Sequence, residues 1–134
     1  MKLAKFSLFT TALIFLGIGL FCLFAPIEAS TLVDIQLSNA TAITDFRANY
    51  GGCIIGIGLF YVYCYLSSDY IRLGLILQAL SFGGFVVGRL IGIIFDGIPK
   101  PLLIYFLIAE LIMVIVAIIS LNKVGKTRRP YLYS

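Results

Sequence analysis

Long apolar stretches alternate with short polar segments along the chain. Four stretches stay apolar for about 20 residues, the length that a helix needs to cross a hydrocarbon core about 30 Å thick. They are residues 6–25, 49–66, 71–95 and 101–121. Pro26 ends the first stretch, and Pro101 begins the fourth at the first helical position, where proline is favoured.

Each stretch is predicted to be helical, because hydrocarbon offers the backbone no water to bond. The period-two alternation of a membrane β-barrel is absent. We therefore expect an all-α fold, a four-helix bundle forming a single integral membrane domain over residues 1–134. The last two connections are short and predict antiparallel neighbours, whereas residues 26–48 predict a long, ordered outer loop between helices 1 and 2.

Composition strengthens the membrane prediction and excludes several classes of chemistry. Hydrophobic residues make up 61% of the chain and charged residues 12%, which is more apolar surface than a small soluble domain can bury. The chain has no His, which excludes Ser-His-Asp or Cys-His catalysis and imidazole metal sites. Cys22, Cys53 and Cys64 lie within the spans without zinc-site spacing. No catalytic residue, metal or cofactor is predicted.

The basic residues predict the orientation of the chain. Those on the side of the termini are Lys2, Lys5, Arg72, Lys123, Lys126, Arg128 and Arg129. Only Arg47 and Lys100 fall on the other side, so the positive-inside rule makes both termini cytoplasmic. The basic residues after 122 favour contact with anionic lipid rather than nucleic acid. The alternative for residues 1–29 is a secretory signal, but their apolar run exceeds the usual signal core.

Away from the ends of the predicted spans lie two charges, Arg89 in the third and Glu110 in the fourth. A central Arg costs about 2.5–3.5 kcal/mol on insertion scales, so its guanidinium needs a partner or water. Arg89 lies about 9 Å below the outer end of its helix and Glu110 about 14 Å below that of its own. An Arg side chain can cover this difference, so we predict an ion pair.

The third helix carries a polar stripe at helical spacing. Its members are Gln78, Ser81, Phe85, Arg89, Gly92 and Asp96. Two polar residues, Arg47 and Asn49, enter the second helix from the same outer side. The sequence thus predicts a polar pocket in the outer half of the bundle. The expected ligand-binding residues are Arg47, Asn49, Gln78, Arg89, Asp96 and Glu110. Two interpretations stay open: an ion-paired lock between helices, or a site for a small polar or anionic group.

Glycines at four-residue spacing form a second pattern. They are Gly52 and Gly56 on the second helix and Gly84, Gly88 and Gly92 on the third. Such spacing allows close backbone approach between membrane helices. We expect packing inside the monomer, with contact in an oligomer as the alternative.

The ordered segments Arg47-Ala48-Asn49-Tyr50-Gly51-Gly52, Gly88-Arg89 and Asp96-Gly97-Ile98-Pro99, followed by Glu110, carry a resemblance. The chain resembles an uncharacterised family of small bacterial four-helix membrane proteins related to the DoxX-like group. This resemblance implies a bundle in the bacterial cytoplasmic (inner) membrane and no established activity. It singles out Arg47, Gly52, Arg89, Asp96, Gly97 and Glu110.

Three functions are compatible with these features. The leading hypothesis is a non-enzymatic protein whose pocket holds a lipid headgroup, another small amphiphile or a partner membrane subunit. The first alternative is a small proton-coupled multidrug-type transporter, which the Arg beside Glu110 disfavours. The second is a membrane enzyme that uses Asp96 or Glu110 for acid–base chemistry on a lipid or quinone. The expected partners are membrane lipids, with a homo-oligomer or a partner membrane protein left open.

Overall fold

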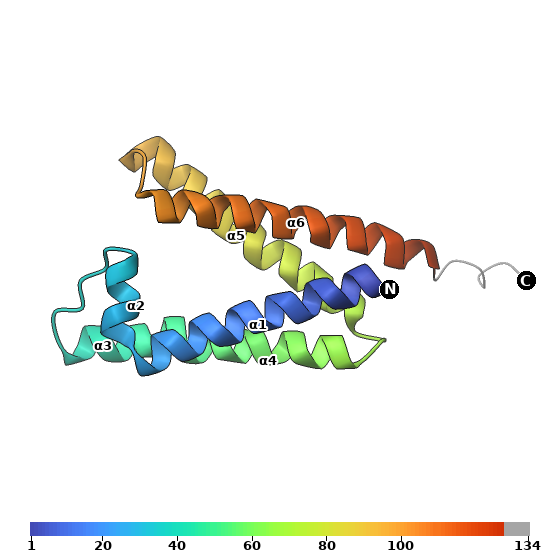
Figure 1. The fold of residues 1–134 in the computed structure, drawn as a ribbon, viewed down its shortest axis with the longest axis horizontal. Coiled ribbons are helices and arrows are strands. Elements are labelled where there is room, and N and C mark those ends of the chain that lie inside the picture. Colours follow the sequence, from blue (N-terminus) through green and yellow to red (C-terminus); the bar gives the residue numbers. More distant parts are fainter. Residues whose placement is uncertain (128–134) are drawn as a thin grey trace, which may run out of the picture. The chain divides into compact units, whose positions relative to one another are not determined.

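The computed structural model describes residues 1–127, and this part of the chain is helical without a strand (Figure 1). The elements are α1 (Lys2–Phe24), α2 (Pro26–Leu32), α3 (Ala40–Phe46), the π-helix η1 (Arg47–Gly52), α4 (Cys53–Leu66), α5 (Ile71–Asp96) and α6 (Pro101–Thr127). The all-α prediction is therefore confirmed for the described residues. Arg128 and Arg129, part of the predicted basic tail, lie outside them.

Four helices are long and apolar enough to cross a membrane: Lys2–Phe24, Ala40–Leu66, Ile71–Asp96 and Pro101–Gly125. The second begins at Ala40 rather than near residue 49, because α3, η1 and α4 follow one another without a break. Its start is capped by Asn39, whose Oδ1 accepts a hydrogen bond from the Ala42 backbone N–H at 2.9 Å. Polar residues in its first turns hide this start from a search for apolar runs.

Residues 26–48, the expected long loop, are mostly helical. Helix α2 begins at Pro26 and ends in a Schellman-type turn, with hydrogen bonds from Asp34 N to Thr31 O and from Ile35 N to Ser30 O. Asp34 occupies the left-handed position of this turn at φ 59°, which Asp tolerates better than most residues. Ile35 then packs against a small apolar cluster of Cys22, Ala29 and Phe46.

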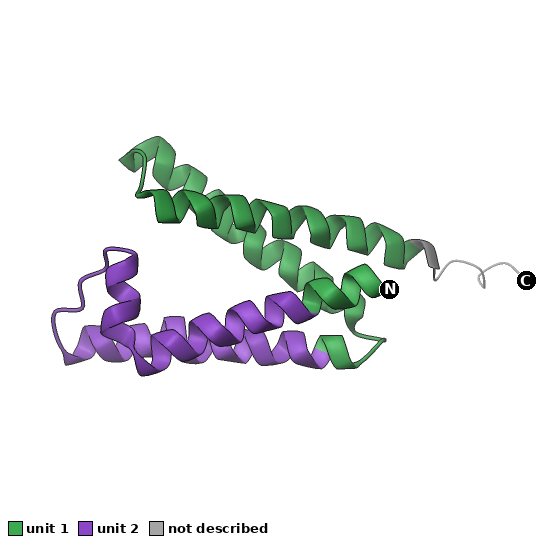
Figure 2. Ribbon diagram, viewed as in Figure 1, with its two compact units in different colours: residues 1–8, 64–134 green, residues 9–63 purple. Residues whose placement is uncertain are grey.

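The chain divides into two compact units (Figure 2). Unit 1 contains residues 1–8 and the chain from residue 64 onward, and unit 2 contains residues 9–63. In unit 2, α1 lies antiparallel to the continuous helix α3–η1–α4. The contacts along this seam pair Phe15 with Tyr61, Leu16 with Gly58, Gly19 with Ile55 and Leu23 with Gly51.

Unit 1 is built around the hairpin of α5 and α6. The buried residues of α5 recur at steps of three and four: Ile71, Gly74, Leu75, Gln78, Phe82 and Val86. Those of α6 also share one face, at spacings of three, four and seven: Leu107, Glu110, Ala117, Ser120 and Val124. Gly97 makes the connection possible, because its φ of 97° with ψ of −176° is accessible to little besides glycine.

Candidate functional site

The predicted ion pair between Arg89 and Glu110 is present in unit 1. Arg89 Nε lies 2.8 Å from Glu110 Oε2, and Arg89 Nη2 lies 2.9 Å from Glu110 Oε1. The guanidinium therefore meets the carboxylate side-on with two parallel hydrogen bonds, the strongest geometry available to this pair. The prediction that Arg89 finds its counter-ion on the neighbouring helix is confirmed.

The periodicity of the two helices places this pair on their packing face. Arg89 lies one turn beyond the buried Val86 on α5, and Glu110 follows Leu107 on α6. The Glu110 side chain is only 9% exposed, whereas that of Arg89 is 28% exposed. The carboxylate is thus enclosed between the helices, while the guanidinium reaches the surface of unit 1.

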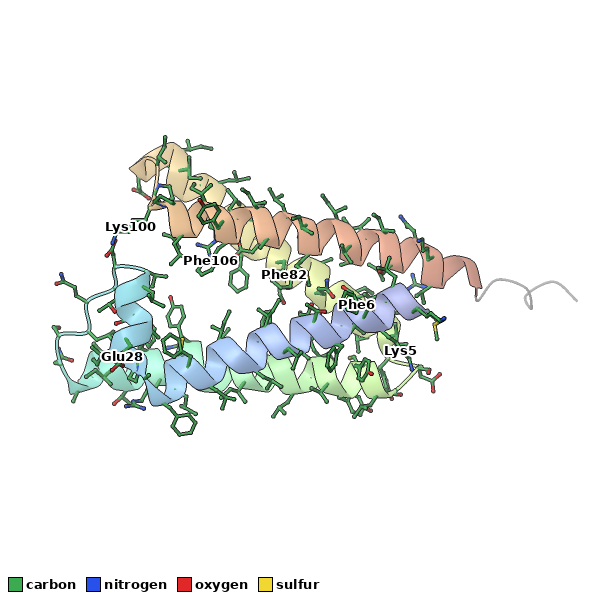
Figure 3. The ribbon with its side chains drawn as sticks, in the orientation of Figure 1. Lys5, Phe6, Glu28, Phe82, Lys100 and Phe106 are labelled. Carbon is green, nitrogen blue, oxygen red and sulfur yellow. The ribbon has the colours of Figure 1, made fainter. Side chains whose placement is uncertain are left out.

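One edge of the guanidinium is not used by Glu110. Within residues 1–127, Arg89 Nη1 donates no hydrogen bond. Phe106 of α6, labelled in Figure 3, also contacts this group, with Arg89 Cζ 5.6 Å from the ring centroid in a cation–π arrangement. Phe85, one turn below Arg89 on α5, is 41% exposed. The site combines a fixed guanidinium, a free donor and two aromatic rings.

Asp96 stands two turns above Arg89 at the last position of α5. Its carboxylate leans back along the helix, since Oδ2 lies 3.9 Å from the position of a Cβ built on Gly92. Gly92 lies between the two charged residues on the same helix face and leaves the space between them open. Asp96 forms no hydrogen bond or ion pair with the described chain.

Gln78, which was expected to bind ligand, lies apart from the ion pair. It is fully buried, and its Nε2 donates to Ser7 Oγ at 2.8 Å and to the Met113 carbonyl at 3.1 Å. It lies eleven positions before Arg89, which is about 16 Å along the helix axis. Gln78 therefore connects α1, α5 and α6 far from the ion pair. Sequence reasoning missed Ser7 and Met113, because many other groups could bond a buried amide.

Arg47 and Asn49 lie in unit 2, and both bond within it. The Arg47 guanidinium donates through Nη1 to the Leu23 carbonyl in the last turn of α1, whose terminal carbonyls lack intrahelical partners. Asn49 Nδ2 donates to Asp45 Oδ1 at 2.9 Å. The structure thus brings Arg89 together with Glu110 and, separately, Asn49 with Asp45. The single pocket expected from all these residues stays a prediction.

The predicted packing glycines are not those that make close contacts in the described residues. No atom lies within 4 Å of a Cβ built at Gly56, Gly84 or Gly88, outside the helix's own backbone, and Gly92 meets only Asp96. Gly52 faces only the Arg47 carbonyl, at 4.0 Å. The close approaches instead occur at Gly19, Gly51, Gly58 and Gly74. Packing at the glycines with four-residue spacing stays a prediction, whereas the close contacts within the described chain lie at single glycines where two helices cross.

The described residues contain no group of three or more His, Cys, Asp or Glu side chains that could hold a metal ion. The model of one protein family, described as a domain of unknown function (DUF4345), matches residues 3–121. No curated protein matches the sequence, and no solved structure does.

Proposed function

Because the chain belongs to the DUF4345 family, whose function is unknown, we propose its role from the geometry of unit 1. The protein is a multi-pass membrane protein that holds the anionic head of a lipid or another small amphiphile at Arg89. It acts by binding rather than by catalysis. In this proposal, Glu110 fixes the position of the guanidinium and Arg89 binds the ligand.

The observation that carries the proposal is the unequal burial of the pair. Glu110 is enclosed and fixes the guanidinium through two hydrogen bonds, while Arg89 keeps Nη1 unbonded and is 28% exposed. A lock between two helices needs no exposed donor. A binding site does, because a phosphate or carboxylate oxygen must reach the guanidinium without displacing Glu110.

The depth of Arg89 in the membrane also supports binding of a lipid head. The 26 residues of α5 extend about 39 Å, so about 4–5 Å at each end lies beyond a hydrocarbon core about 30 Å thick. Arg89 is seven positions before the end of α5 and therefore lies about 6 Å inside the core. A lipid phosphate lies within reach of an Arg side chain at this depth. Phe85 and Phe106 would then contact the first methylenes of the amphiphile.

The location and orientation of the protein belong to the same proposal. We place it in a bacterial cytoplasmic membrane with both termini in the cytoplasm and Arg89 in the outer half, and we keep the relation to the DoxX-like group as part of this assignment. The distribution of Lys and Arg along the sequence supports this orientation.

The contacts of Glu110 give the transporter alternative no support. A proton-coupled exporter needs a carboxylate that can release its proton and receive a cation. Both oxygens of Glu110 already accept hydrogen bonds from Arg89. We therefore retain the binding function.

Native mass spectrometry of the gently extracted full chain tests the proposal. We expect wild type to retain phospholipid, Arg89→Ala to lose most of it, and Arg72→Ala to retain it. Arg72 is the matched control because it is an exposed arginine at the other end of α5. Since Arg89→Ala leaves Glu110 unpaired, the double variant Arg89→Gln/Glu110→Gln removes the same charge without an orphaned carboxylate. Unchanged retention in both Arg89 variants would overturn the proposal.

A further inference from the structure

We infer that the site selects a zwitterionic head, in which an ammonium group accompanies the phosphate, as in phosphatidylethanolamine. This inference rests on the proposed function and deepens it by naming the class of lipid. The feature that carries it is the juxtaposition of Arg89, Gly92 and Asp96 on one face of α5.

The two charges lie on one face of α5, and the Asp96 carboxylate is directed back toward Arg89. Arg89 and Asp96 are seven positions apart and so share one face of the helix. The Asp96 carboxylate leans toward Gly92, which lies about 4.5 Å above Arg89 along the axis. Two methylene groups join the ammonium and the phosphate oxygen of an ethanolamine head, so its two charges lie close together, as do the two side chains on this face of α5.

Arg89 and Asp96 each match one charged group of the ethanolamine head. Arg89 offers the unbonded Nη1–H to a phosphate oxygen. Asp96 offers a carboxylate that no described residue bonds, to an ammonium with three donors. Asp96 also lies at the C-terminal end of α5, where the helix dipole disfavours a negative charge and favours a nearby cation.

Gly92 leaves this face of the helix open. A Cβ at this position would make ordinary van der Waals contact with Asp96 Oδ2, at 3.9 Å, and a longer side chain would extend into the space beside the carboxylate. A purely anionic head, such as that of phosphatidylglycerol, could reach Arg89 but would place no cation beside Asp96. The carboxylate would then repel it, which is how unfavourable charge juxtaposition gives selectivity.

Competition between two lipids in native mass spectrometry tests the inference. The full chain is stripped of lipid and incubated with equal amounts of phosphatidylethanolamine and phosphatidylglycerol of identical acyl chains. We expect wild type to prefer phosphatidylethanolamine by about tenfold, the factor expected from one charge-assisted hydrogen bond. Asp96→Asn should abolish the preference while phospholipid still binds, and Asp96→Glu should keep it.

Glu28→Gln is the matched control, since it removes one exposed carboxylate from α2 in unit 2 (Figure 3). It should keep the full preference. A wild type that binds both lipids equally, or an Asp96→Asn variant that keeps the preference, would overturn the inference while leaving the proposed function intact. A wild type that binds neither lipid would overturn the proposed function itself.

Discussion

At the residue scale, the Glu110 carboxylate depends on one guanidinium for both of its hydrogen-bonded oxygens. Arg89→Ala should therefore lower the free energy of unfolding by about 3 kcal/mol, because it leaves a buried charge unpaired. Arg89→Gln/Glu110→Gln should lose clearly less, since two neutral amides can bond each other. Denaturant unfolding in one detergent, followed by circular dichroism, measures both. Equal losses would show that the unpaired Glu110 carboxylate is not the source of the cost.

Gln78 presents the opposite case, a neutral polar group bonded on two sides. Gln78→Leu removes its hydrogen bonds to Ser7 and Met113 but keeps an apolar side chain of similar volume. Interhelical hydrogen bonds in membrane proteins average about 0.6 kcal/mol, so we expect a loss of about 1 kcal/mol. Lipid retention should not change, because Gln78 lies about 16 Å from Arg89 along α5. Ser7→Ala in the same background should add little further loss, which a double-mutant cycle would detect.

Glu110 and Gln78 show which side-chain contacts could be predicted from the sequence and which could not. A charge inside hydrocarbon has few acceptable partners, so Arg89 and Glu110 could be paired from their depths alone. A buried amide can bond any nearby hydroxyl or backbone carbonyl. The partners of Gln78 could therefore not be chosen before the helix crossings were known. The same applies to Arg47, which bonds a backbone carbonyl that no sequence pattern marks.

At the scale of helices, the glycines of α1 provide a matched pair. A Cβ at Gly19 would lie 2.7 Å from Ile55 Cγ1 and 2.9 Å from the Ile55 backbone N, whereas a Cβ at Gly17 meets nothing within 4 Å. Gly19→Ala should cost about 1–3 kcal/mol through overpacking against a backbone that cannot move aside. Gly17→Ala should be neutral or slightly stabilising, because Ala favours the helix. Unfolding midpoints of the two variants in the same detergent give the comparison. A Gly19→Ala variant as stable as wild type would contradict the α1–α4 seam.

Hydropathy predicted the presence of four membrane-length helices but not all of their ends. Apolar length is read directly from the sequence, and it located both ends of α5 and the start of α6, whereas α1 begins four residues earlier and α6 ends six residues later than predicted. The start of α3 is capped by Asn39, and the π-helix η1 includes Gly51, which packs closely against Leu23. Both features come from local hydrogen bonding and tertiary contact, which an apolar pattern does not record.

At the scale of the whole molecule, the charge bias predicts one fixed orientation, and single cysteines can test it. In a background with Cys22, Cys53 and Cys64 replaced by Ala, Gln36→Cys lies between α2 and α3, and Ser68→Cys lies between α4 and α5. Both positions are exposed. An impermeant maleimide should label Gln36→Cys in intact cells and label Ser68→Cys only after permeabilisation, since the positive-inside rule predicts that the Ser68 side is cytoplasmic. The reverse labelling pattern would show that the protein has the opposite orientation, and equal labelling would indicate dual topology. Either result would mean that Arg89 does not lie exclusively in the outer leaflet. The orientation therefore decides which leaflet supplies the lipid that Arg89 can bind.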